Sequence, residues 1–188
     1  MPRKKTLKQV RKALIDNNLV ELPRSLKRAD LVEGYVVAIG SRWVVLATPT
    51  SGHPDGWSIV RRADLRGVWA GLGERFVRRV YELEDCWPPA PPTAPLVLDG
   101  TAQELIDSAA AAFPLVVMYV GDEDYCQIGR PTRCTKKWVY WRDLDRNAEW
   151  VPAVHRYRAS DILRVDLGGR YEASLARVAG LSKNAHLV

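Results

Sequence analysis

The stretch 41-SRWVVL-46 has a counterpart in 136-KKWVYW-141, and this pair decides how the chain is divided. In each stretch a tryptophan, Trp43 or Trp138, directly follows a short polar turn. The two tryptophans stand 95 residues apart, and the same displacement relates other parts of the chain. Self-similarity at a fixed spacing indicates one structural unit that occurs twice. The sequence therefore predicts two tandem copies.

Helix-start patterns recur at this displacement. The stretches 6-TLKQ-9 and 101-TAQE-104 both have the spacing of a capping box, in which a hydroxyl and a side chain three residues later satisfy early backbone N–H groups. After the tryptophans the register moves by two residues, so that 61-RRADL-65 matches 158-RASDI-162, and it then returns to 95 in the closing helices. Chance similarity would not restore its register in this way.

Each copy reads as one helix, five short strands and a closing helix. Five short strands in a unit too small for a flat open sheet predict a strongly bent sheet that closes as a small barrel. The predicted fold class is α+β, with two tandem copies of a helix, a five-stranded small barrel and a short C-terminal helix. The expected boundaries are a basic tail over 1–5, a first repeat over 6–85, a proline-rich linker over 86–100 that forms an extended spacer, a second repeat over 101–180 and a tail over 181–188.

The two tryptophan strands are expected to be buried on both faces. Side chains alternate along a strand, so Trp138 and Tyr140 point one way while Val139 and Trp141 point the other. Both sets are apolar, whereas a platform for stacking nucleic-acid bases would carry a polar face around its rings. We therefore interpret these rings as core, with the lysines of the preceding turn reaching solvent.

The net charge of +6 is concentrated at the N-terminus. Residues 1–28 hold nine basic and two acidic side chains, while the rest of the chain holds 19 basic and 20 acidic ones. A stripe of cations on the first helix, opposite Leu7, Val10 and Leu14, would contact phosphates without reading sequence. The candidate nucleic-acid-binding residues are Arg3, Lys4, Lys5, Lys8, Arg11, Lys12, Arg42, Arg66, Lys136 and Lys137.

No pattern for catalysis, a metal or a cofactor is found. The three cysteines, Cys86, Cys126 and Cys134, form no C-x-x-C pair, which argues against a disulfide framework or a zinc site and favours buried thiols. The three histidines, His53, His155 and His186, are too scattered to suggest a metal cluster. Neither a nucleophile elbow nor a P-loop occurs, so we expect no enzyme. No apolar run is long enough to cross a bilayer, and the N-terminus has no signal-peptide core, so a cytoplasmic protein without membrane contact is expected.

The helix, the glycine-led second strand and the run 65-LRGV-68 resemble the Sm-like barrels, whose last strands carry a hydrophobic-Arg-Gly motif. The resemblance implies a five-stranded SH3-type barrel that can pair edge to edge with others. Of the RNA-binding residues of that family only Arg66-Gly67 matches, because the turn 40–42 offers neither the acid nor the amide, so a uridine pocket is not implied. The run 162-ILRVDLGGRYEASL-175 is also similar to the end of small bacterial proteins without an assigned role.

Two functions are compatible with this sequence. The first is a non-catalytic binding or adaptor protein, built from a duplicated small barrel, in which barrel edges or the groove between the copies receive a strand or helix of a partner protein. The alternative is RNA or DNA binding through the basic N-terminal helix and tail. The sequence leaves the partner, protein or nucleic acid, unresolved.

Overall fold

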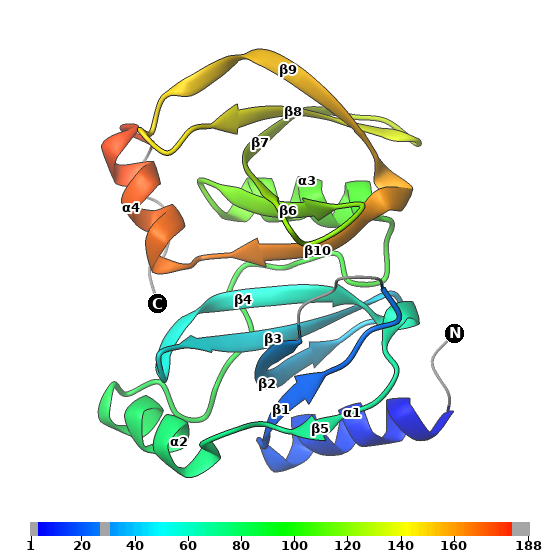
Figure 1. The fold of residues 1–188 in the computed structure, drawn as a ribbon, viewed down its shortest axis with the longest axis vertical. Helices are drawn as coiled ribbons and strands as arrows, with labels where there is room; N and C mark the ends of the chain where they lie inside the picture. The colour runs from blue at the N-terminus through cyan, green and yellow to red at the C-terminus, as the bar shows by residue number, and fades with distance from the viewer. Residues whose placement is uncertain (1–3, 27–30, 182–188) are drawn as a thin grey trace.

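The computed structural model describes residues 4–26 and 31–181 of the chain (Figure 1). The first half contains α1 (Lys4–Asp16), β1 (Leu19–Leu22), β2 (Val32–Ile39), β3 (Trp43–Thr50), β4 (His53–Arg61), the 3-10 turn η1 (Arg62–Asp64), β5 (Trp69–Ala70) and α2 (Glu74–Leu83). The second half contains α3 (Ala102–Ala112), β6 (Val116–Val120), β7 (Cys126–Cys134), β8 (Trp138–Leu144), β9 (Trp150–Arg158), the 3-10 turn η2 (Ala159–Asp161), β10 (Ile162–Leu167) and α4 (Arg170–Val178). The elements follow one another in the same order in both halves.

All described strands belong to one antiparallel sheet. Its strand order is β5-β1-β2-β3-β4-β10-β6-β7-β8-β9. In each half, the last strand along the chain lies beside the first one: β5 beside β1 and β10 beside β6. The halves join where β4 pairs with β10, with Val60 opposite Arg164 and Trp57 opposite Leu167. Figure 1 shows this junction as the two strands that run side by side across the middle of the molecule. The ends of the sheet are the two-residue strand β5 and the nine-residue strand β9.

The prediction of two closed barrels is wrong, and with it the Sm-like and SH3-like architecture of duplicated barrels. The sheet is open, because β4 pairs with β10 of the other half and does not return to β5 of its own half. Edge strands expose main-chain groups that need partners, and pairing across the junction satisfies them without closure of either half. The run 65-LRGV-68, expected in a last strand, lies between η1 and β5 and forms only an isolated bridge from Leu65 to Arg24. Local patterns also do not specify which strand pairs with which.

The halves also share a core. One cluster of buried apolar side chains contains Tyr35 and Ile59 from the first half together with Leu105 and Trp141 from the second, all 0% exposed. A second cluster lies under α1, which buries Val10 among residues of β2 and β3. Because apolar burial is the main stabilising contribution to folding, the shared cluster stabilises the junction beyond its strand pairing.

The prediction that both faces of the second tryptophan strand are core is half right. Val139 and Trp141 are 0% exposed. Trp138 and Tyr140, on the opposite face, are only half-buried. Arginine side chains lie over these two rings.

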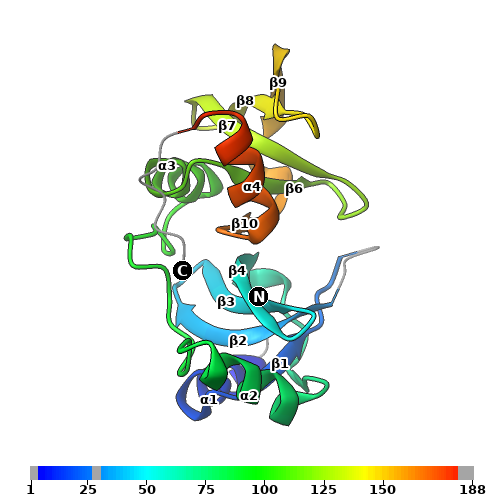
Figure 2. The same cartoon turned by 90° about the vertical axis from the view of Figure 1, so that its left-hand side faces the viewer.

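The linker is held against the sheet along one side of the molecule (Figure 2). The indole Nε1 of Trp57 donates to the carbonyl of Ala90 at 2.9 Å, and that of Trp43 donates to the carbonyl of Gly100 at 3.1 Å. The ring of Trp87 meets that of Tyr35 edge-on at 5.5 Å. The backbone N–H of Val97 donates to the hydroxyl of Ser108 in α3 at 3.1 Å, so the expected spacer is a strap that contacts both halves.

Two of the three thiols are half-buried, while Cys126 is exposed, contrary to expectation. Burial, and secondarily a hydrogen bond with Asp107, raises the pKa of Cys134 to about 12. Since the thiolate is the reactive form, we expect iodoacetamide at pH 8.5 to modify Cys134 at least about a hundredfold more slowly in the folded chain than in urea. Peptide mass spectrometry over time measures both rates, and equal rates would contradict the raised pKa of the half-buried Cys134.

Among the described residues, no helix combines the length and the apolar character needed to cross a membrane.

Candidate nucleic-acid interface

Arginines and aromatic rings alternate on the outer face of β7, β8 and β9. Directly opposite residues in an antiparallel pair share a face, and Tyr140 is opposite both Arg133 and Arg156. Trp138, two residues before Tyr140, is opposite Arg158. The guanidinium of Arg156 lies 4.2 Å from the ring centroid of Trp138, and that of Arg158 lies 5.4 Å from it. We call these five residues the arginine face.

The segment that contains β7, β8 and β9 is strongly basic. Residues 126–158 hold eight basic and three acidic side chains, a net charge of +5. Asp143 lies on the opposite face, where its carboxylate accepts a hydrogen bond from Trp141 at 3.1 Å and lies 3.5 Å from His155. In the part of the chain that the structure describes, no acidic side chain forms an ion pair with Arg133, Arg156 or Arg158.

A basic cleft of about 600 Å³ lies at the ends of the neighbouring strands. Four cations line it: Arg42, Arg61, Arg62 and Lys136. The first and last come from the turns before β3 and β8, and the other two come from the end of β4 and from η1. Arg61 donates to the carbonyl of Ser160 in η2, and Arg62 donates to that of Gly40 at 3.0 Å. These bonds fix two of the guanidinium groups, and burial lowers the pKa of Arg61.

The basic cleft continues into the arginine face. An adjoining outer groove of about 430 Å³ is lined by Lys136, Lys137, Trp138, Arg158, Ala159 and Ser160. The groove shares Lys136 and the η2 residues with the cleft, and it shares Trp138 and Arg158 with the arginine face. We call the cleft, the groove and the face together the basic track. In Figure 1 the beginnings of α1, β3 and β8 and the end of β9 lie on its right-hand side, where the track is situated.

Helix α1 flanks the track. Its buried side consists of Thr6, Val10 and Ala13, which leaves the predicted cationic stripe exposed: Lys4, Lys5, Lys8, Arg11 and Lys12. Leu7 lines the basic cleft, so the helix meets the track along the edge of its buried side. Lys12 is paired with Asp16, which reduces its availability to a ligand.

The structure brings three of the predicted residues together, because Arg42, Lys136 and Lys137 all lie on the track. Arg66 lies apart from it, and its carbonyl accepts a hydrogen bond from Thr6 at 3.4 Å. Arg3 lies outside the described residues. Sequence reasoning missed Arg61, Arg62, Arg133, Arg156 and Arg158. The spacing of Arg156 and Arg158, two residues apart and hence on one side of a strand, was the available signal.

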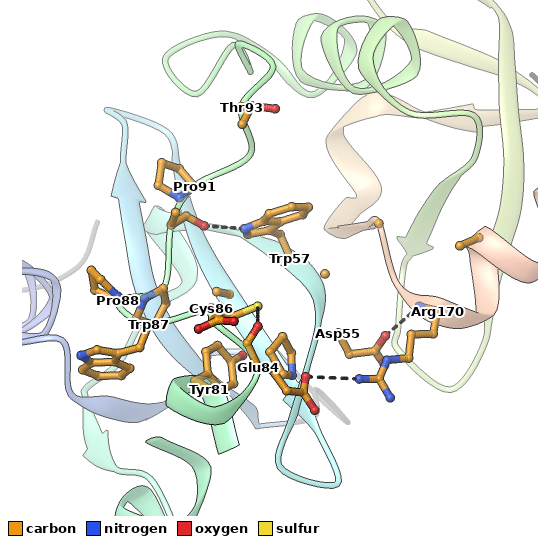
Figure 3. Close-up of a pocket in the computed structure, with 18 of the residues that line it drawn as sticks. Asp55, Trp57, Tyr81, Glu84, Cys86, Trp87, Pro88, Pro91, Thr93 and Arg170 are labelled. Atoms are coloured by element: carbon orange, nitrogen blue, oxygen red, sulfur yellow. Dashed lines mark hydrogen bonds and ion pairs between the residues drawn. The ribbon is translucent and has the colours of Figure 1, made fainter. Parts of the chain in front are cut away.

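A second cavity, of about 520 Å³, lies between the strap, α2, α4 and the beginning of β4 (Figure 3). Two acidic residues of its lining, Asp55 and Glu84, contact Arg170. Arg170 donates its backbone N–H to Asp55 at 2.7 Å and lies 3.7 Å from Glu84, which in turn contacts His53. These contacts hold α4 against the first half.

No group of three or more histidine, cysteine or acidic side chains within residues 4–26 and 31–181 is placed to hold a metal ion. No protein-family model, curated protein or solved structure matches this chain.

Proposed function

We propose that this chain is a non-catalytic nucleic-acid-binding protein and that the basic track contacts the phosphate backbone. One observation carries the proposal: basic side chains continue from the basic cleft through the outer groove onto the arginine face, where no acidic side chain among the described residues forms an ion pair with Arg133, Arg156 or Arg158. A run of positive charge along one surface is the electrostatic footprint of a polyanion-binding protein. This site differs from the N-terminal arm expected from the sequence, since its central residues come from β7–β9.

Six cations of the track form no ion pair within residues 4–26 and 31–181 and can contact phosphates: Arg42, Arg133, Lys136, Lys137, Arg156 and Arg158. Each neutralised phosphate releases condensed counterions, so affinity falls with salt concentration. Six contacts to a single strand predict a slope of log K against log salt of about −4. The exposed cations of α1 flank the track and are not among these six contacts.

The test is a titration of a fluorescein-labelled mixed-sequence oligonucleotide at several salt concentrations, read by anisotropy. We expect binding with a slope of about −4, and a slope that stays near this value when Lys4, Lys8 and Arg11 are replaced by glutamine, because the counted contacts all lie on the track. Substitution is preferred to deletion of residues 1–12, because Val10 is 0% exposed and deletion would open the core. Absence of binding at the lowest salt concentration would overturn the proposal.

A second candidate is a protein adaptor, favoured by the free edge of β9. This strand ends the sheet and, among the described residues, pairs only with β8, while residues 152–156 are exposed. Such an edge can receive a strand from a partner protein. Nuclease treatment of material co-purified with the chain separates the two candidates: a protein held by the edge remains bound, whereas one held through nucleic acid is lost.

A further inference from the structure

We infer that the nucleic acid held by the track is single-stranded, with bases stacked on the arginine planes of the arginine face. This inference rests on the proposed function and names its ligand class. It depends on how the guanidinium groups are held, on the spacing of the rings, and on the groove beside them.

Each ring of the arginine face has a guanidinium over it. Trp138 has Arg156 at 4.2 Å and Arg158 at 5.4 Å, and Tyr140 has Arg133 at 5.8 Å. Contact with an aromatic face restricts the arginine to few conformations, so less conformational entropy is lost when a ligand binds. A planar group held over a ring offers its outer plane, and unpaired bases stack on arginine planes as they do on aromatic rings.

The spacing of the rings favours an unstacked strand. Trp138 and Tyr140 are two residues apart on β8, so their backbone positions are roughly 6.6 Å apart along the strand. Successive bases within one strand of a duplex are only about 3.4 Å apart. Two successive bases that stack at Trp138 and at Tyr140 are therefore separated from each other. The faces of such bases are accessible only when the nucleic-acid strand is unpaired.

The outer groove provides room beside these stacks. Its volume of about 430 Å³ lies within the range of small-ligand pockets, and Trp138 forms one wall. Lys136 and Lys137 line the same groove and supply charges for phosphates on either side of a stacked base. A single strand can turn its bases toward the rings and its phosphates toward the lysines, while a duplex presents only phosphates and groove edges.

The experiment compares a labelled mixed-sequence single strand of about a dozen nucleotides with the blunt duplex of the same sequence, at one salt concentration. Arg156→Lys keeps the charge and removes the plane, and Trp138→Leu removes the ring beneath it. Arg177→Lys on α4, away from the track, is the matched control. Circular dichroism and thermal melting establish that each variant is folded. Arg156→Lys is expected to fold normally because it alters only an exposed side chain.

We expect the unaltered chain to bind the single strand about tenfold or more tightly than the duplex. Arg156→Lys should weaken single-strand binding by roughly fivefold while changing duplex binding less than about twofold, and Arg177→Lys should change neither. Equal affinity for both ligands, or equal losses for both in Arg156→Lys, would overturn the inference and leave backbone binding standing. Failure to bind either ligand would overturn the proposed function itself.

Discussion

Replacing Arg42, Lys136 and Arg158 together by glutamate is expected to lower the affinity for a single-stranded oligonucleotide by at least about a hundredfold at low salt. These three residues come from the turn before β3, the turn before β8 and the end of β9, and they span the basic cleft and the outer groove. Each substitution removes one phosphate contact and adds a repulsive charge. The slope of log K against log salt should shrink from about −4 to about −2, because each contact to a single strand contributes about 0.7.

A matched control separates the track from overall charge. Glutamate at Arg75, Arg79 and Arg177 makes the same change in net charge on exposed positions of α2 and α4, outside the track. Long-range attraction alone would weaken in both triple variants, whereas loss of specific phosphate contacts would appear only in the first. An equal loss in the control would show that binding depends on net charge and not on the track.

Helix starts show how far local sequence patterns determined the fold. The capping box at Thr101 is confirmed: its hydroxyl accepts from the N–H of Glu104, and the Glu104 carboxylate accepts from the N–H of Thr101 at 2.7 Å. The same pattern at Thr6 is not a cap, because α1 already includes Lys4 and the hydroxyl of Thr6 bonds to Arg66. The hydroxyl of Thr6 bonds to a residue that is distant in the sequence, and a local pattern contains no information about such a contact.

Local sequence patterns did not predict which strands pair with each other. The junction of β4 with β10 joins residues about a hundred positions apart, and either strand could have met an edge within its own half. The candidate site depends on the same information. Arg156 and Arg158 become part of a surface with Trp138 only through the register of β8 with β9, and a count of charge along the chain placed the positive end at residues 1–28.

Glu123→Ala is expected to lower the free energy of unfolding by about 3–5 kcal/mol. The carboxylate of Glu123, in the turn between β6 and β7, forms a bidentate ion pair with Arg24, which follows β1, and both side chains are 0% exposed. Arg164 of β10 lies 3.9 Å from the same carboxylate. Alanine removes the carboxylate from a buried bidentate ion pair, and removing one partner of a buried pair costs far more than opening an exposed one. Chemical denaturation monitored by circular dichroism measures the change.

The paired replacement Arg24→Met with Glu123→Leu removes both charges of the pair together, and so tests whether the loss in Glu123→Ala comes from the removal of one partner alone. Apolar side chains of similar volume in place of a buried ion pair are often neutral or stabilising, so the double variant should regain at least half of the stability that Glu123→Ala loses. Opening the exposed pair of Lys12 and Asp16 through Asp16→Asn should leave the unfolding midpoint nearly unchanged. If Glu123→Ala behaved like Asp16→Asn, the ion pair would lie in water. The two halves would then be held together by the β4–β10 pairing, the strap and the shared core without help from buried charge.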